Sequence, residues 1–295
     1  MREIVIISGK GGTGKTSLAA CFAHLAKNKI ICDLDVDTPD LHILLQPDHE
    51  REVEFWAGNE ARIDTDACIG CGTCEEMCRY GAISHDDDDL YRVDPIRCEG
   101  CKVCVTFCPE QVISFPEKHC GTWYVSSTRF GTMVHAQLFP GEENSGRLVA
   151  LLKNEARQLG KKEGVDWILS DGVPGVGCPV ISSLSGADYV VIVTEPTPSG
   201  RHDLERVAAL CDHFRLPAGI IINKADLNTE VADAIAGYCG EKGYPVIARF
   251  PHDPLVTEAM VQGKALTELG QGELDRAIRA AWRKIEELAG EAGKG

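Results

Sequence analysis

Two groups of residues in this sequence have types and spacing that suit chemistry: a glycine-rich loop near the start and a doubled set of cysteines further on. The loop at residues 9–16 reads Gly-Lys-Gly-Gly-Thr-Gly-Lys-Thr. In such a loop, backbone N–H groups surround phosphate oxygens, and the partial positive charge of a following helix adds to the attraction. The motif predicts that Lys15 binds the β- and γ-phosphates of a nucleotide and that Thr16 holds Mg²⁺.

Eight cysteines follow in two runs that share one spacing. In each run two residues separate successive cysteines among the first three, and three residues precede the fourth. Three thiolates at this spacing wrap one corner of an iron–sulfur cubane, while the fourth crosses to the neighbouring cluster. The spacing therefore predicts two [4Fe–4S] clusters. One is held by Cys68, Cys71, Cys74 and Cys108, and the other by Cys98, Cys101, Cys104 and Cys78.

Zinc is the alternative metal for these cysteines, since tetrahedral Cys₄ sites also use Cys-x-x-Cys pairs. A third thiolate after two further residues, repeated in both runs, favours iron–sulfur clusters. The runs resemble bacterial two-cluster ferredoxins, with one departure: Arg79 follows Cys78 where the ferredoxin pattern has proline. This departure bears on the local turn and not on the ligation.

Length and composition narrow the class of protein. The chain has 295 residues, of which 44% are hydrophobic, with a net charge of −15 and 14 cysteines. Such acidity argues against nucleic acid or an anionic membrane as the main partner. Because the sequence has no run of 18 apolar residues and no leader before the first strand, we expect a cytoplasmic protein. Its cysteines then stay reduced, which favours metal ligation over disulfides.

Strands and helices alternate outside the cysteine runs. The apolar run at 4–7 predicts a buried strand before the glycine loop, and residues 17–27 predict the helix after it. Further strands are expected at 29–32, 123–127, 133–139, 166–171, 189–194 and 219–222, and helices at 41–45, 147–159 and 274–288. This alternation predicts an α/β fold with a doubly wound, mostly parallel sheet. A ferredoxin module of α+β type at 60–117 interrupts the P-loop domain, which comprises 1–59 and 118–295.

The residue after the first glycine of the loop is a lysine, Lys10. Together, Lys10 and Lys15 form the "deviant" phosphate-loop signature, and the chain resembles the MinD, ParA and Mrp superfamily of ATPases. That group includes the nitrogenase iron protein. The resemblance covers essentially the whole chain, extends to members with an inserted ferredoxin domain, and implies Mg²⁺-dependent hydrolysis of ATP. It also implies that Lys10 reaches across a homodimer interface to the partner's nucleotide.

Carboxylates after two apolar strands complete the expected site. The segment at 33–41 resembles the first switch of the family, with Asp35 at the position that orients the hydrolytic water. Asp37 or Asp40 is then a candidate contact to the γ-phosphate. The same segment also suits an Asp-rich turn that caps the helix after it.

The strand at 166–171 and the glycine-containing loop after it resemble the second switch. The resemblance implies that Asp171 polarises a Mg²⁺-bound water and that Gly175 donates its N–H to the γ-phosphate. Mg²⁺ is therefore expected at Thr16, Asp35 and Asp171. The expected catalytic residues are Lys10, Lys15, Asp35 and Asp171.

Residues 223–226, Asn-Lys-Ala-Asp, match the base-reading motif of guanine-binding GTPases. In the MinD group the position of Asn223 also contacts adenine, so this residue is a base-contact candidate for either nucleotide. The loop at 249–254 is expected to form the other wall of the pocket. We favour ATP because the phosphate loop is of the ATPase type. The expected nucleotide-binding residues are Gly9, Lys10, Gly11, Gly12, Thr13, Gly14, Lys15, Thr16, Ser17, Gly175, Asn223, Pro251 and Asp253.

Other residues allow two interpretations. Cys178 is either a small buried side chain or a metal or redox thiol shared across a dimer. Cys120 is interpreted as an ordinary linker thiol, with a fifth cluster ligand as the alternative. Ser199 and Asp203 suit the start of a helix, although their loop resembles one beside the nucleotide. The four aspartates at 86–89 form either a solvated loop or part of an acidic face for a basic redox partner.

From these observations we expect a nucleotide-gated iron–sulfur ATPase. ATP closes a homodimer, or a heterodimer with a similar ATPase, and hydrolysis is coupled to electron transfer through the two clusters to a partner. The alternative is ATP-dependent assembly or carriage of iron–sulfur or mixed-metal clusters for a client protein, as in Mrp-type relatives. A spatial regulator of the ParA kind would need a membrane-binding tail or a basic DNA-binding patch, and residues 290–295 offer neither.

Overall fold

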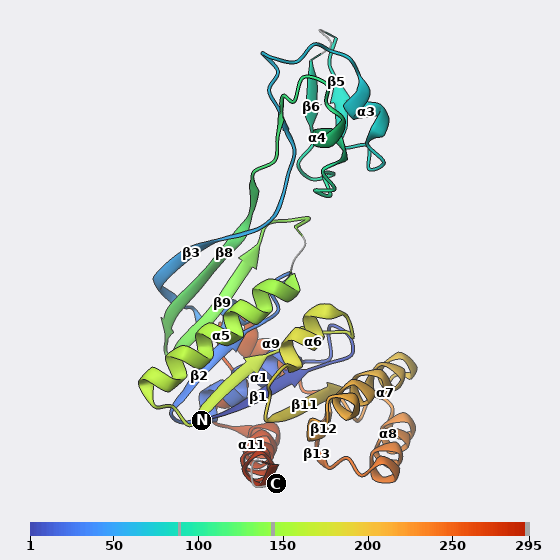
Figure 1. Cartoon of the computed structure of the whole chain (residues 1–295). Coiled ribbons are helices and arrows are strands. Elements are labelled where there is room, and N and C mark those ends of the chain that lie inside the picture. Colours follow the sequence, from blue (N-terminus) through green and yellow to red (C-terminus); the bar gives the residue numbers. More distant parts are fainter. Residues whose placement is uncertain (88–89, 143–144, 293–295) are drawn as a thin grey trace. The chain divides into compact units, whose positions relative to one another are not determined.

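The computed structural model describes residues 1–87, 90–142 and 145–292 (Figure 1). The chain divides into two compact units. The first comprises Met1–Val53, Trp123–Gln137 and Ser145–Gly295, and the second comprises Glu54–Thr122 and Leu138–Asn144. The module boundaries expected at residues 60 and 117 stay a prediction. Residues 88 and 89 of the acidic run and residues 293–295 of the C-terminal ending lie outside the described part of the chain.

A nine-stranded sheet has the order β13-β12-β11-β1-β10-β2-β9-β8-β3. All pairings from β13 through to β9 are parallel. This confirms the predicted α/β fold with a mostly parallel sheet. The strands are β1 (Arg2–Ile7), β2 (Lys29–Asp33), β3 (Asp48–Asn59), β8 (Glu117–Thr128), β9 (Gly131–Leu138), β10 (Trp167–Asp171), β11 (Tyr189–Thr194), β12 (Ala218–Ile222) and β13 (Val246–Arg249).

The central strands are buried on both faces. Ile4 and Ile6 of β1 belong to a large hydrophobic cluster, whereas Val5 and Ile7, on the opposite face of the strand, are also fully buried. Successive side chains of a strand point to opposite faces, so an unbroken apolar run is what a doubly covered strand requires. This is why the glycine loop that follows Ile7 starts from a rigid position.

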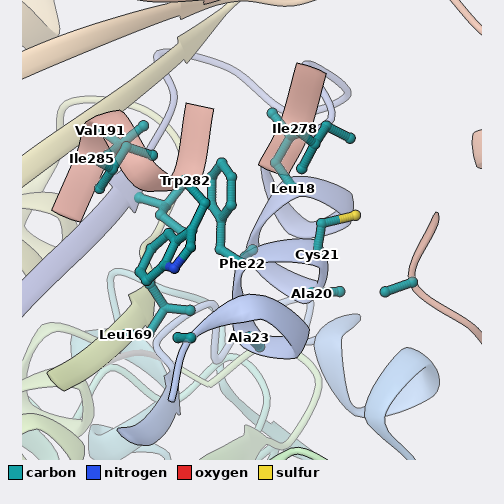
Figure 2. Packing of buried hydrophobic residues seen from close by; sticks show 14 of the residues in the cluster. Leu18, Ala20, Cys21, Phe22, Ala23, Leu169, Val191, Ile278, Trp282 and Ile285 are labelled. Carbon is teal, nitrogen blue, oxygen red and sulfur yellow. The ribbon is translucent and has the colours of Figure 1, made fainter. Parts of the chain in front are cut away.

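Helices α1 (Lys15–Leu25) and α11 (Gly272–Ala292) cover one face of the sheet. Figure 2 shows the contact between them, where the rings of Phe22 and Trp282 lie with their centroids 5.5 Å apart. Buried residues of α11 recur at helical spacing, which confirms the predicted core-facing helix at 274–288. They include Leu274, Ile278, Trp282 and Ile285.

The other helices complete the first unit. Helices α5 (Ser145–Glu163) and α6 (Cys178–Leu184) pack against each other, and α5 also contacts β2 and β10 (Figure 1). The rest are α2 (Leu41–Leu45), α7 (Pro198–His213), α8 (Thr229–Lys242), α9 (Pro254–Val261) and α10 (Leu266–Leu269). Within the described part of the chain, no helix has the length and apolar character needed to span a bilayer.

The sequence does not predict strand β3. Most of its side chains are exposed, several are charged, and only Phe55 and Ala57 are buried. β3 is the last strand at one edge of the sheet, where exposed charged side chains are tolerated and protect against unwanted pairing. The module expected at 60–117 therefore comes directly after a strand that the sequence does not predict.

The second unit contains two short antiparallel strand pairs and two short helices. Strand β4 (Arg62–Ile63) pairs with β7 (Ile113–Ser114), and β5 (Ile83–His85) pairs with β6 (Tyr91–Val93). Helices α3 (Thr73–Met77) and α4 (Val103–Phe107) each follow the first cysteines of one run. The buried hydrophobic cluster of the unit is small, and consists of Ala61, Cys74, Ile83, Tyr91 and Ile113.

Candidate functional site

The glycine loop lines a cavity of about 430 Å³ in the first unit. This volume is in the range of pockets that hold small molecules. The cavity brings together segments that follow the carboxyl ends of parallel strands, where doubly wound sheets bind their ligands. The predicted site residues that line it are Gly11, Gly12, Gly14, Lys15, Thr16, Ser17, Asp35, Asp40, Asn223, Pro251 and Asp253. The predicted residues Gly9, Lys10, Thr13, Asp171 and Gly175 lie outside this lining.

Lys15 is the most enclosed charge at the cavity. It begins α1, and its side chain is only 6% exposed. Its Nζ lies 2.8 Å from Asp171 Oδ1 and 3.6 Å from Asp35 Oδ2. Burial lowers the pKa of Lys15, but these carboxylates outweigh burial, and the net direction of the pKa is upward. Lys15 therefore carries its positive charge into the cavity, where a phosphate would meet it.

Three buried polar atoms near Lys15 have no hydrogen-bond partner among the described residues: Thr13 Oγ1, Asp33 Oδ2 and Asp171 Oδ2. Asp33 and Asp171 are register partners at the ends of β2 and β10. Burial, together with the charge of Asp171, raises the pKa of Asp33 well above its usual value. Because an unsatisfied buried polar group costs about 1–3 kcal/mol, these atoms indicate a site that a polar ligand completes. Mg²⁺, which binds one or two carboxylates together with water and phosphate oxygens, fits this donor set.

Lys10 is bound within its own chain. Its Nζ lies 2.7 Å from Glu195 Oε1 and donates to Thr197 Oγ1 and Ser199 Oγ, each at 3.1 Å. Burial raises the pKa of Glu195, but the hydrogen bonds from Lys10 and Lys224 outweigh burial, and the net direction of that pKa is downward. The lysine that the family resemblance assigns to a partner's nucleotide is therefore held by an ionised carboxylate beside its own glycine loop.

Asn223 and Lys224 position the glycine loop. Asn223 Nδ2 donates to the carbonyl of Thr13 at 2.8 Å, and Lys224 Nζ donates to the carbonyl of Gly12 at 2.8 Å. Gly14 has a φ of 89°, and a Cβ there would lie 2.4 Å from Asn223 Nδ2, so the contact requires glycine. The base contact expected for Asn223 stays a prediction, since its amide NH₂ donates to the loop.

The two segments expected to sense a γ-phosphate, around Asp35 and Gly175, form hydrogen bonds within the chain. The N–H of Gly175 donates to the carbonyl of Ser8 at 2.8 Å. Thr38 Oγ1 donates to Asp35 Oδ1 at 3.2 Å. Of the two further candidates after Asp35, Asp40 lines the cavity and Asp37 does not. Geometry therefore favours Asp40.

The second unit contains two hollows, each lined by four cysteines. Cys68, Cys71, Cys74 and Cys108 line the first hollow, and Cys78, Cys98, Cys101 and Cys104 line the second. These are the two ligand sets that the spacing predicts. Among residues 1–87, 90–142 and 145–292, no three His, Cys, Asp or Glu side chains converge as they would on a single metal ion. Sulfurs distributed around a hollow fit a cubane, which has a volume of its own and takes one thiolate at each iron.

Contacts to the sulfurs support this fit. The backbone N–H of Ala82 donates to Cys78 Sγ at 3.3 Å, and backbone N–H groups commonly stabilise thiolates bound to iron. Burial raises the pKa of the Cys74 thiol to about 11. A free thiolate is therefore disfavoured at Cys74, and a metal that replaces the proton removes this cost.

Cys178 and Cys120 differ in their surroundings. Cys178 is exposed at the first position of α6, whereas Cys120 is buried in β8 and its Sγ donates to the carbonyl of Ala57 at 3.1 Å. Neither lines a cysteine hollow. Cys120 is thus a buried structural thiol, and Cys178 is accessible to a partner.

The sequence predicts no role for Asp33, Glu195 or Lys224. Asp33 and Glu195 do carry a local signal, since each is a carboxylate at or directly after the end of a buried strand. Lys224 carries no signal in the sequence beyond its place in the base-reading motif. Ser199 and Asp203, expected as helix-start residues, lie in the first turns of α7, but Thr197 is the N-cap, and its hydroxyl accepts from the N–H of Gly200.

Comparisons with known proteins identify the inserted module and a sequence relative. Residues 61–115 match the family described as a 4Fe-4S dicluster domain, which implies two clusters. The uncharacterized protein MJ0578 of Methanocaldococcus jannaschii is 32% identical over 229 residues, which cover 77% of this chain and 79% of that protein.

Solved structures show the same fold at low identity. The septum site-determining protein MinD of Pyrococcus horikoshii, complexed with Mg-ADP, superposes with a TM-score of 0.58 at 18% identity and covers 100% of this chain and 99% of that one. A ParA family ATPase of Chlorobium tepidum gives 0.53 at 16% identity, with coverage of 96% and 98%. The chain therefore belongs to a family that combines the MinD/ParA-like P-loop ATPase fold with an inserted 4Fe-4S dicluster domain at residues 61–115.

Proposed function

We propose that this protein is a Mg²⁺-dependent ATPase whose nucleotide state controls electron transfer through two [4Fe–4S] clusters to a redox partner. One observation carries the proposal: a single chain contains a cavity lined by a phosphate-binding loop and two hollows, each lined by four cysteines. The structural relative that is complexed with Mg-ADP supports the choice of an adenine nucleotide.

The residues in and around the cavity have separate roles in hydrolysis. Lys15 binds the β- and γ-phosphates, and Thr16, Asp35 and Asp171 hold Mg²⁺, which when bound neutralises charge on those phosphates. Asp35 orients the attacking water, and burial raises the pKa of its carboxyl despite the opposing charge of Lys15. A raised pKa makes a carboxylate a better proton acceptor.

Nucleotide binding favours the dimer because it changes the contacts of Lys10. Lys10 is paired with Glu195 of its own chain, and this pair competes with any contact to a second subunit. Likewise, the N–H of Gly175 is taken by Ser8. A γ-phosphate that competes for both groups stabilises a different arrangement, and its loss on hydrolysis returns the first, which is the requirement for a population shift.

Two substitutions at the Lys10–Glu195 pair are expected to act in opposite directions. Lys10→Ala should remove nucleotide-dependent dimerisation, whereas Glu195→Gln should release Lys10 and raise the dimer fraction at limiting Mg-ATP. Sedimentation velocity with a slowly hydrolysed ATP analogue measures both. The matched control is Glu205→Gln, which removes an exposed charge that pairs with Arg201 on α7. If Lys10→Ala dimerises like the wild type, Lys10 has no role in trans.

Coupling is tested by anaerobic purification, iron and sulfide counts, and EPR spectra with and without Mg-ATP. We expect the spectrum of the reduced clusters, or their rate of oxidation by an acceptor, to depend on nucleotide. The dependence should disappear in Lys15→Met, which keeps the cysteines but loses the ammonium group proposed to bind the phosphates. Spectra and rates that ignore nucleotide in the wild type would contradict the coupling.

Cluster assembly or carriage is the second candidate, and the exposed thiol of Cys178 favours it. In that case the clusters are cargo and should pass to an apo-acceptor protein under chelator challenge. An electron-transfer protein should instead retain its iron while it cycles with a reductant. Iron transfer measured with and without Mg-ATP separates the two functions, and Cys178→Ser shows whether that thiol takes part.

A further inference from the structure

The two halves of the insert repeat one plan but differ in charge. The first hollow is bordered by residues 68–77 and 108–111, which contain three carboxylates and neither Lys nor Arg. The second is bordered by residues 98–107 and 78–81, which contain two cations, Arg79 and Lys102, and one carboxylate, Glu99. Of these, Glu110 lines the first hollow, and Lys102 and Glu99 line the second.

Lys102 is in a backbone conformation that favours glycine. It is the N-cap of α4 with a φ of 65°, and its counterpart in the other half is Gly72, the N-cap of α3 with a φ of 76°. A residue with a Cβ is strained in this left-handed region. An observed strain of this kind points to a function for the side chain, because glycine would serve the backbone better.

The exposed side chain of Lys102 lies beside the second hollow. Its Nζ lies 5.7 Å from the centroid of the Phe115 ring, which lines the same hollow. The N–H of Ala82, which donates to Cys78 Sγ, adds a second positive dipole at this ligand set. Nearby positive charge and hydrogen bonds to the sulfurs both stabilise the reduced, more negative state of an iron–sulfur cluster.

We propose that Lys102 and Glu110 give the two clusters different reduction potentials, with the higher potential at the set of Cys78, Cys98, Cys101 and Cys104. One electron from a low-potential protein donor reduces the insert. The cluster that Cys68, Cys71, Cys74 and Cys108 would hold would give up this electron, and the cluster that Cys78, Cys98, Cys101 and Cys104 would hold would take it up. An oxidised partner protein accepts it from there. This direction of flow rests on the electron-transfer function proposed above.

The test is a redox titration of the anaerobically purified full chain, followed by EPR and without nucleotide. The wild type should show two potentials, assigned to their sites with Cys71→Ser and Cys101→Ser, each of which alters the signal of one cluster. Lys102→Gly should lower the higher potential by about 59 mV, which corresponds to a tenfold change in the ratio of reduced to oxidised form for one electron. This variant also relieves the backbone strain, so it should fold at least as well as the wild type.

Lys102→Arg is the matched control and should keep the potential, since it keeps the charge. Glu110→Gln should raise the lower potential and leave the other unchanged. Equal potentials in the wild type, the opposite order, or a Lys102→Gly variant with unchanged potentials would overturn the assignment. Because no nucleotide is present, these outcomes are independent of whether ATP controls electron transfer.

Discussion

Replacing Lys15 with methionine is expected to lower the affinity for Mg-ATP by more than about 100-fold, because two charge-assisted hydrogen bonds to phosphate, each worth about 1.5–3 kcal/mol, are lost. Methionine keeps most of the apolar stem and removes the ammonium group that lies 2.8 Å from Asp171. Calorimetric titration of the anaerobic protein with Mg-ATP measures the effect. An affinity equal to that of the wild type would remove Lys15 from the phosphate site.

The same substitution also bears on stability. Lys15 and Asp171 are both nearly inaccessible to solvent, and removal of one partner of a buried ion pair costs about 3–5 kcal/mol. The double variant Lys15→Met, Asp171→Asn removes both charges and should regain part of the lost thermal stability. It should not regain nucleotide affinity. This comparison distinguishes a lost ligand contact from an unfolded protein.

Removal of iron is expected to unfold the inserted module while the nucleotide unit stays folded. The buried hydrophobic cluster in the described part of the module has only five members, and one of them, Cys74, is itself a predicted ligand. A core of that size does not sustain a domain of this length without metal or cross-links. After chelation, amides at 61–115 should exchange at least about 100-fold faster with deuterium, which corresponds to a loss of about 2.7 kcal/mol. Amides of β1 and β10 should keep their protection.

Single cysteine substitutions give the matched comparison. Cys74→Ser should reduce the iron and sulfide content and expose the module, whereas Cys178→Ser, at an exposed thiol outside both hollows, should change neither. Measurements are iron and sulfide assays together with limited proteolysis mapped by mass spectrometry. A module that stays protected without iron, or one that is purified with zinc, would contradict the assignment of these cysteines to iron–sulfur clusters.

Local patterns explain how much of the fold was predictable. Strands β1, β2, β10, β11 and β12 are runs of apolar residues covered on both faces, so the sequence predicts them almost to their ends. Strand β3 carries an exposed, charged sequence because it lies at an edge. Its place is decided by pairing with a distant strand, which a local pattern does not encode.

In the candidate sites, too, local features can be predicted from the sequence and contacts between distant residues cannot. The glycine loop and both cysteine sets can be recognised from spacing within a few residues, and their roles in binding stay predictions. The contact between Lys10 and Glu195 joins residues that are far apart in the chain and has no spacing signature. The same holds for Asn223, whose motif suggested a base contact while its side chain binds the glycine loop. Long-range partners of charged side chains were the part that the sequence alone could not predict.

The paired contacts of Glu195 have a consequence for the order of events. One of its oxygens binds Lys10 and the other binds Lys224, which in turn holds the carbonyl of Gly12. These contacts hold Lys10 and the rim of the glycine loop together within one chain. If nucleotide-dependent dimerisation proceeds as proposed, nucleotide must displace these contacts before two chains can join through Lys10. The rate of dimer formation should then be proportional to the square of the concentration of nucleotide-bound chains, and not to the total concentration of the protein.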